Sequence, residues 1–316
     1  ALGAASSGQL QAIITTSGTA VANLHPAVLE AHHSGVPLIL LTADRPAELR
    51  GKGANQTTNQ VGIFNDAVIE CIDVAAPTEE VVAELPERAR DLVKRVVELA
   101  IAKRQPVQLN LQFIEPLSAT EPVAAEIYKT LKVEEIPVIT PGKTTLQLSN
   151  RAVVIAGDSA EEHREEIAQL GLPVFAEPSS GVRDLANSIS NYRQLLADRS
   201  HLFGEIDQIV VYGKPTLSRP VISLLKSENI EVLVRPGRMG NFQIPETAKT
   251  ITAEITNPSS DASWLQLWLE ADEPNPSVGF NRQSIIHEVY ESAPEVLVFG
   301  ASQLIREADF CAPKLP

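Results

Sequence analysis

Short runs of apolar, often β-branched residues alternate along this chain with longer segments in which apolar residues recur every three or four positions. The runs are typical of buried strands, and the longer segments of helices that cover a sheet. This alternation predicts an α/β fold of successive parallel sheets covered by helices. In the first part of the chain we expect strands at 11–16, 36–42, 68–74 and 106–113, and helices at 19–33 and 79–102. Pro26 is expected either to kink the first helix or to mark a first turn.

The same alternation resumes after a stretch of different character. Residues 121–145 are predicted to be a linker, because the surrounding segment contains Pro122, Pro137 and Pro141 and few long apolar runs. Beyond it we expect strands at 152–156, 172–176, 209–212, 230–234, 249–255 and 296–300, and helices at 161–170, 220–227, 261–271 and 283–291. Trp264 and Trp268 stand at helical spacing and are predicted to pack in a core.

The length of the chain suggests more than two domains. The chain has 316 residues, and a domain usually takes about 150. The strand and helix after residue 276 would open a third α/β unit, but about 40 residues cannot bury a core of their own. The chain starts at Ala1 and its one Met is Met239. We therefore expect a chain that is cut at both ends.

Charge and composition exclude several classes of function. Lys plus Arg number 26 and Asp plus Glu number 40, so the formal net charge is −14. Such a balance argues against binding of nucleic acid and of an anionic membrane surface. No apolar run reaches ~18 residues, so no membrane span is expected. Cys71 and Cys311 lie far apart without metal-like spacing, which fits a reducing cytoplasm, and we predict no metal ligands in this chain.

Several turns that follow predicted strands carry small or polar residues. The turn at 16–19 has two interpretations. Either Ser17 or Thr19 caps the following helix, or the turn binds a ligand close to the backbone. The turn at 42–46 contains Asp44 and Arg45, which either pair with each other or face a ligand at the carboxyl edge of the sheet. The polar loop 53–58 is either plain surface or functional.

The second half offers further turns of the same kind. Residues 154–159 weakly resemble a dinucleotide-binding turn but lack its glycine fingerprint, and 177–181 is interpreted as structural. Lys214 and Arg219 flank a predicted helix start, where cations are disfavoured unless an anion lies near, which favours an anionic substrate. Ser302 and Arg306 are four positions apart and fit one helical face.

Taken together, three of these segments resemble one family. They read TSGTAVAN at 16–23, LTADRP at 41–46 and GANQ at 53–56, with EPSSG at 177–181 and GASQLIR at 300–306 in matching order. The family is that of the thiamine-diphosphate-dependent 2-succinyl-5-enolpyruvyl-6-hydroxy-3-cyclohexene-1-carboxylate (SEPHCHC) synthases of menaquinone biosynthesis. The resemblance spans nearly the whole chain.

The resemblance implies an architecture and a reaction. Residues 1–120 would be a pyrimidine-binding domain lacking its N-terminal part, 146–275 a central domain, and 276–316 the start of a diphosphate-binding domain. The implied enzyme is a cytoplasmic transferase that decarboxylates 2-oxoglutarate on thiamine diphosphate and adds the succinyl unit to isochorismate. The cofactor supplies the difficult chemistry, with Mg²⁺ or Mn²⁺ as its metal.

The resemblance also assigns individual residues. Those expected to bind the cofactor are Thr16, Ser17, Gly18 and Asn23. Those expected to bind substrate are Arg45, Asn55, Gln56, Arg219, Ser302 and Arg306, with Gln56 also expected to be catalytic. Three arginines suit two substrates that carry carboxylates, because Arg–carboxylate pairs are strong and directional. One departure is Ser218, where some members carry a basic residue.

Two parts of the family pattern fall outside this sequence. The Glu that activates the cofactor would precede Ala1, and the segment that holds the metal and diphosphate would follow Pro316. If the 316 residues are the whole protein, we expect no turnover. The family also implies a homodimer or homotetramer. The alternatives are an acetolactate-synthase-like or 2-oxoacid-decarboxylase-like enzyme, and a non-catalytic α/β module.

Overall fold

A computed structural model of the chain forms two compact units, 1–138 and 139–316, each described by itself. The structure describes residues 1–6, 9–78, 84–115, 117, 145–198, 201–235, 244–256, 263–273, 281–292, 297–300 and 302–311. Most of the predicted linker 121–145 lies outside these residues. The division into three domains therefore stays a prediction.

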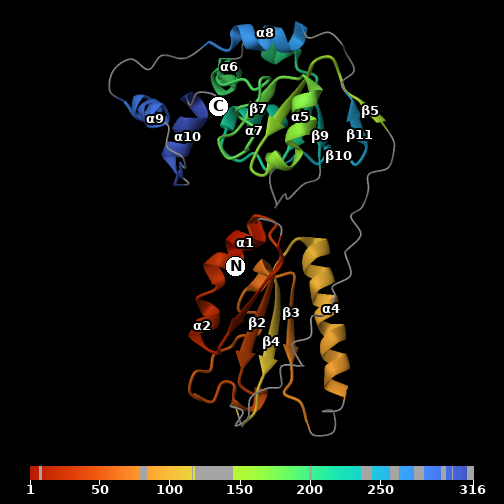
Figure 1. Cartoon of the computed structure of the whole chain (residues 1–316), viewed down its shortest axis with the longest axis vertical. Helices are drawn as coiled ribbons and strands as arrows, with labels where there is room; N and C mark the ends of the chain where they lie inside the picture. The colour runs from red at the N-terminus through yellow and green to blue at the C-terminus, as the bar shows by residue number, and fades with distance from the viewer. Residues whose placement is uncertain are drawn as a thin grey trace. The chain divides into compact units, whose positions relative to one another are not determined.

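The first unit is built on a parallel sheet of four strands (Figure 1), in the order β1-β2-β4-β3. The strands are β1 (Gln11–Thr15), β2 (Leu38–Asp44), β3 (Glu70–Val74) and β4 (Val107–Gln112). Because all pairs are parallel, every strand ends at the same edge of the sheet. In this register Thr15 lies beside Thr42, and Thr42 beside Asn110.

Helices cover both faces of this sheet, as Figure 1 shows. They are α1 (Leu2–Ser6), α2 (Thr19–Ala22) and α3 (His25–His33) on one face and α4 (Leu85–Lys103) on the other. Side chains alternate across a strand, so Leu38 and Leu40 pack with the first group, whereas Ile39 packs against Val96 and Ala100 of α4. Burial on both faces explains why β2 reads as a continuous apolar run.

The second unit contains a five-stranded parallel sheet in the order β10-β9-β8-β6-β7. Its strands are β6 (Ala152–Ala156), β7 (Val174–Ala176), β8 (Gln208–Tyr212), β9 (Glu231–Val234) and β10 (Lys249–Thr250). Around it lie α5 (Arg164–Leu170), α6 (Tyr192–Ala197), α7 (Arg219–Leu225) and α8 (Ser263–Ala271). Trp264 and Trp268 of α8 are both buried in this core, which confirms their predicted packing role.

Two smaller pieces complete the second unit. Strands β5 (Thr145–Gln147) and β11 (Glu254–Thr256) form a separate parallel pair (Figure 1). Helices α9 (Arg282–Glu291) and α10 (Gln303–Cys311) pack together around Ile286, Tyr290 and Ala308. The capping box of Asn281 and Ser284 fixes the start of α9.

Three of the predicted elements were wrong in detail. The helix expected at 19–33 is two helices, because the chain turns between α2 and α3 and Pro26 occupies the first turn of the second. The strand expected at 249–255 is divided between β10 and β11, which belong to different sheets. Residues 297–300 have no strand partner among the described residues and form no strand, although their apolar sequence suits one. A strand forms only where a neighbour completes its hydrogen bonds.

Within the described ranges, none of the helices has both the length and the apolar character needed to cross a membrane.

Candidate functional site

A pocket of about 420 Å³ opens at the carboxyl edge of the first unit's sheet. The turns after β1 and β2, the loop before β3 and the segment after β4 supply its walls. Its lining residues are Thr16, Ser17, Ala43, Asp44, Arg45, Gln56, Phe113, Ile114 and Leu117. The structure therefore brings together four residues of the predicted site, which are Thr16, Ser17, Arg45 and Gln56. They meet because parallel strands end at one edge.

Gln56 is bonded directly to the turn after β1. Its Nε2 donates to Oγ1 of Thr16 at 2.8 Å and to the carbonyl oxygen of Ser17 at 3.2 Å. The Ser17 hydroxyl donates in return to the carbonyl oxygen of Gln56 at 2.8 Å. Gln56 has a φ of +57°, a left-handed conformation that is uncommon for a residue with a side chain. The mutual bonds hold this conformation, so both turns form one polar wall.

Gly18 is required for this close approach. Its φ is +79°, and a Cβ at this position would lie 3.2 Å from both Cγ and the carbonyl oxygen of Gln56. Only glycine meets the conformation and the contact without strain. The N-cap of α2 is Gly18 and no side chain caps this helix, so capping by Ser17 or Thr19, one of the two interpretations of the turn, was wrong.

Arg45 carries a guanidinium that no acidic side chain pairs with in the part of the chain that the structure describes. The interpretation that Asp44 pairs with Arg45 was wrong for the side chain. Asp44 instead accepts the backbone N–H of Arg45 at 2.7 Å and forms an ion pair with Arg50 at 2.8 Å. Arg50 also binds Asp73 through two hydrogen bonds of 2.8 Å. Arg45 thus lines the pocket without an acidic partner among the described residues.

An apolar wall formed by Phe113, Ile114 and Leu117 was missed by the sequence reasoning. Each is about half exposed, at 49%, 50% and 55%, and all three line the pocket. The signal was present, because Phe113 ends a predicted strand whose carboxyl end had to reach the same edge. The pocket therefore has a polar side made by Ser17 and Gln56 and an apolar side.

Two other predicted residues of this unit lie nearby without lining the pocket. Asn23 is exposed at the C-terminal end of α2, where its backbone N–H donates to the carbonyl oxygen of Thr19. Asn55 is exposed beside Gln56. Their assigned roles stay predictions.

Arg219 begins α7 in the second unit and lines a shallow pocket of about 360 Å³ with Thr216, Ile222 and Lys226 among others. The loop that precedes Arg219 contacts a buried carboxylate, that of Glu177. Glu177 is 1% exposed, and its Oε1 accepts the N–H groups of Thr216, Leu217 and Ser218 at 3.1, 2.8 and 3.3 Å. Glu177 therefore supplies an anion near this helix start.

Burial dominates the electrostatics of that carboxylate. Removal from water raises the pKa of Glu177 to about 7, although the three backbone N–H groups act in the opposite direction. Residues 177–181 were interpreted as structural, and the position of Glu177 beneath the loop that presents Arg219 extends that interpretation.

Ser302 and Arg306 are both exposed in the second unit. Ser302 directly precedes α10, and Arg306 lies in the first turn of this helix. The carbonyl oxygen of Arg306 accepts a hydrogen bond from Arg193 of α6 at 2.6 Å. One turn further on, the buried carboxylate of Asp309 accepts a short hydrogen bond from the hydroxyl of Tyr192. Burial raises the pKa of Asp309. These contacts fix α10 against α6.

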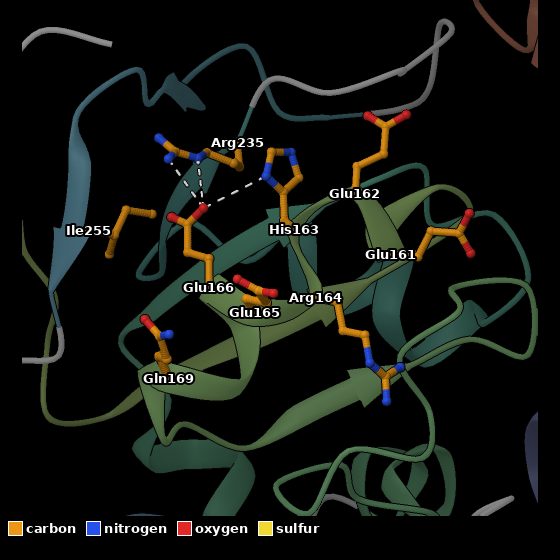
Figure 2. A pocket seen from close by; sticks show the side chains of 9 residues that line it. All are labelled: Glu161, Glu162, His163, Arg164, Glu165, Glu166, Gln169, Arg235 and Ile255. Carbon is orange, nitrogen blue, oxygen red and sulfur yellow. Dashed lines mark hydrogen bonds and ion pairs between the residues drawn. The ribbon is translucent and has the colours of Figure 1, made fainter. Parts of the chain in front are cut away.

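A pocket of about 670 Å³ in the second unit contains none of the predicted residues (Figure 2). It is lined by Glu161, Glu162, His163, Arg164, Glu165, Glu166, Gln169, Arg235 and Ile255. Arg235 donates from Nε to Oε2 of Glu166 at 3.2 Å, and His163 lies 3.7 Å from the same oxygen. Both of its arginines are already paired, Arg235 with Glu166 and Arg164 with Asp184. Because three further glutamates also line it, this pocket does not suit a dicarboxylate.

The turn that weakly resembled a dinucleotide site has a structural explanation. A Cβ on Gly157 would lie 2.1 Å from the backbone carbon of Lys214. Asp158 and Lys214 exchange backbone hydrogen bonds of 3.1 and 2.9 Å across this contact. Gly157 therefore permits two turns to meet, and its presence does not require a ligand.

Comparisons with known proteins support the same family as the sequence motifs. Residues 1–63 match the family model of the thiamine pyrophosphate enzyme, N-terminal TPP binding domain. Similar curated proteins are named 2-succinyl-5-enolpyruvyl-6-hydroxy-3-cyclohexene-1-carboxylate synthase. The one from Renibacterium salmoninarum is 38% identical, over 94% of this chain and 55% of its own. That from Leifsonia xyli is 40% identical, over 97% and 60%.

A third relative of the same name, from a Nocardioides species, is 37% identical over 99% of this chain and 58% of its own. The chain thus spans a little over half the length of the curated relatives that it matches. The match also extends well beyond residues 1–63, through both units. The chain is therefore similar to the SEPHCHC synthases along nearly its whole length, and its first 63 residues match the N-terminal TPP binding domain of the thiamine pyrophosphate enzymes.

Proposed function

We propose that this protein is a SEPHCHC synthase. In this function it decarboxylates 2-oxoglutarate with thiamine diphosphate and transfers the succinyl unit to isochorismate in menaquinone biosynthesis. The observation that carries the proposal is the pocket at the carboxyl edge of the first sheet, where Ser17 and Gln56 face an apolar wall and Arg45 supplies a charge. The relatives' shared name supports the same reaction.

The pocket fits the pyrimidine part of the cofactor by its chemistry. A flat aromatic ring with polar edges suits a space that is polar on one side and apolar on the other. The missing side chain of Gly18 leaves room beside Gln56 that a Cβ would fill. Thr16, Ser17 and Gly18 would hold the ring, and thiamine diphosphate would supply a carbanion equivalent after decarboxylation. Asn23 belongs to the proposed cofactor set through its family motif.

Arg45 is proposed to bind a substrate carboxylate. Among the described residues no carboxylate competes for its guanidinium, and an Arg–carboxylate pair in a partly buried pocket is directional as well as strong. Gln56, with Nε2 held by Thr16, is proposed to orient the reacting groups, and Asn55 to contact substrate beside it. In the second unit, Arg219 and Arg306 are proposed from their family motifs to bind substrate carboxylates, and Ser302 to contact substrate through its hydroxyl.

The remaining parts of the proposal concern the metal, the assembly and the location. Within the described ranges, no group of three His, Cys, Asp or Glu side chains is arranged to hold a metal ion. Mg²⁺ or Mn²⁺ is proposed to bind with the diphosphate, as the family implies, and no described residue is assigned as its ligand. A homodimer or homotetramer is proposed from the family, and a cytoplasmic location fits two cysteines that are both free.

The test uses the longest reading frame that contains these residues. The purified protein is mixed with thiamine diphosphate, Mg²⁺, 2-oxoglutarate and isochorismate, and both isochorismate loss and CO₂ release are followed. We expect equal amounts of both, and neither without the cofactor. Pyruvate in place of 2-oxoglutarate is the matched control, because it lacks the second carboxylate.

Two outcomes would contradict the proposal. Faster turnover of pyruvate than of 2-oxoglutarate would instead favour an acetolactate-synthase-like enzyme. Failure to consume either substrate, together with no binding of thiamine diphosphate by calorimetry, would favour a non-catalytic module.

A further inference from the structure

The side chain of Gln60 lies between the two turns that form the candidate pocket, although it does not line the pocket itself. It is fully buried, with 0% of its surface exposed. Its Oε1 accepts the backbone N–H of Gly18 at 2.7 Å, and its Nε2 donates to the carbonyl oxygen of Ala43 at 2.9 Å. One amide thus bonds the backbone of both turns.

The same amide continues into a buried network. Nε2 of Gln60 also donates to Oδ1 of Asn110 at 2.9 Å. Asn110, equally buried, donates through Nδ2 to Asp44 and to Asp73, both at 2.8 Å. Asp44 accepts the backbone N–H of Arg45. A continuous chain of hydrogen bonds therefore runs from Gly18 through Gln60 and Asn110 to Arg45.

A glutamine amide is suited to this position. It offers one acceptor oxygen and two donor hydrogens in a fixed plane, and all three are used here. Buried networks of this kind are rigid when every group has a partner and costly when one is removed. The Gly18 amide and the Ala43 carbonyl would both lose their partner if the side chain were apolar.

We propose that Gln60 is a positioning residue that fixes the gap across the pocket between the Ser17–Gly18 turn and the Ala43–Arg45 turn. What the gap holds rests on the proposed function, namely the cofactor ring at one turn and a substrate carboxylate at the other. The tie between the two turns is independent of it. Gln60 acts through the backbone and through Asn110, and does not touch the reacting groups.

The test compares Gln60→Met with Gln108→Met in the protein from the longest reading frame. Gln108 is a matched control because it is also fully buried and in the same network. Its Nε2 donates to Thr42 Oγ1 at 3.1 Å and to the Gln60 carbonyl oxygen at 3.3 Å. Its side chain therefore bonds neither the Ser17–Gly18 turn nor the Ala43–Arg45 turn. Amide hydrogen exchange at Gly18 and Arg45, the Kd for thiamine diphosphate, and kcat and KM for 2-oxoglutarate are measured.

In Gln60→Met we expect exchange at Gly18 to become at least tenfold faster, and Kd and KM to rise at least tenfold. In Gln108→Met we expect the exchange rate at Gly18, the Kd and the KM each to stay within threefold of the wild-type value. Gln60→Glu is the second variant, and it takes the place of Gln60→Met in the test if the methionine variant does not fold. A carboxylate keeps the acceptor for Gly18 and loses both donors, so Gly18 should stay protected while KM for 2-oxoglutarate rises.

Equal exchange at Gly18 in Gln60→Met and Gln108→Met would overturn the proposed tie. Faster exchange with unchanged Kd and KM would overturn the positioning role. If the wild-type protein binds no thiamine diphosphate, the proposed function fails, and the exchange at Gly18 and Arg45 still decides whether Gln60 joins the two turns.

Discussion

The backbone N–H of Leu217 donates a hydrogen bond of 2.8 Å to Oε1 of Glu177, a carboxylate that is buried beneath the loop leading to Arg219. Neighbouring N–H groups of Thr216 and Ser218 converge on the same oxygen. The carboxylate thereby occupies the position of an anion at the start of α7, and it orders the residues that present Arg219.

The first prediction concerns pH. Burial raises the pKa of Glu177 from 4.5 to about 7, so the folded protein binds more protons than the unfolded chain between these values. The free energy of unfolding should therefore fall as pH rises from about 4.5 to about 7, by roughly 3 kcal/mol from this group. Above pH 7 this contribution should become constant. Chemical denaturation at a series of pH values measures the slope.

Glu177→Gln is the matched variant for this measurement, because an amide oxygen placed at Oε1 still accepts the N–H groups of Leu217 and Ser218 and carries no charge. We expect the variant to lack the additional slope and to be the more stable protein at pH 8. Parallel curves for both proteins would show that Glu177 titrates in the same way when folded and unfolded.

The second prediction concerns Arg45. Replacing it with Ala should lower kcat/KM for 2-oxoglutarate about 100-fold, which corresponds to ~2.7 kcal/mol, because a substrate carboxylate loses its charged partner. Arg90→Ala, at an exposed position of α4, is the control and should leave kcat/KM within twofold. Steady-state kinetics of both variants provide the comparison, and an unchanged value for Arg45→Ala would remove this residue from the site.

The third prediction concerns Gly18. Gly18→Ala and Gly62→Ala place a Cβ at similar positive φ values, +79° and +75°, but only the first meets other atoms within 4 Å. The left-handed conformation should cost each variant about 1 kcal/mol. The contact with Gln56 should cost Gly18→Ala about 1 kcal/mol more and weaken thiamine diphosphate binding. Denaturation measures the loss of stability, and calorimetry measures thiamine diphosphate binding. Equal losses of stability in both variants would mean that the turn accommodates the Cβ of Gly18→Ala without cost.

The fourth prediction concerns the contact between α6 and α10. Tyr192→Phe removes the hydroxyl that donates to the buried carboxylate of Asp309, and this should lower the free energy of unfolding by ~2 kcal/mol. Tyr290→Phe is the matched control, because Tyr290 is also buried but its hydroxyl bonds no other described residue. A loss of equal size in both variants would indicate that the Asp309 bond contributes nothing specific.

Much of the first unit followed from local pattern. The buried runs at 36–42 and 106–113 became β2 and β4 with small shifts of their ends, because strands buried on both faces carry an unmistakable apolar signature. The strand predictions failed where pairing with a neighbouring strand determines whether a strand forms. Residues 249–255 form two strands in different sheets, and residues 297–300 form no strand among the described residues. Apolar sequence alone does not specify a partner.

The candidate site divides in the same way. Thr16, Ser17, Arg45 and Gln56 were identified by their motifs, and the pocket brings them together. Phe113 was seen only as the end of a strand, and Gln60 was not singled out. Neither position has a local signature of function, because their importance arises from contacts with residues more than 15 positions away.

The sequence by itself determined the α/β class, the order of most strands and helices, and the segments that resemble SEPHCHC synthases, because these depend on periodicity and short motifs. Only the tertiary structure decided which charged residues are paired and which line the pocket without a partner. Asp44 and Asp73 both bind Arg50 and leave Arg45 unpaired among the described residues. Glu177 fills a helix start that sequence reasoning had left for a substrate. Ion pairing depends on distance in space, and residues far apart in sequence set that distance.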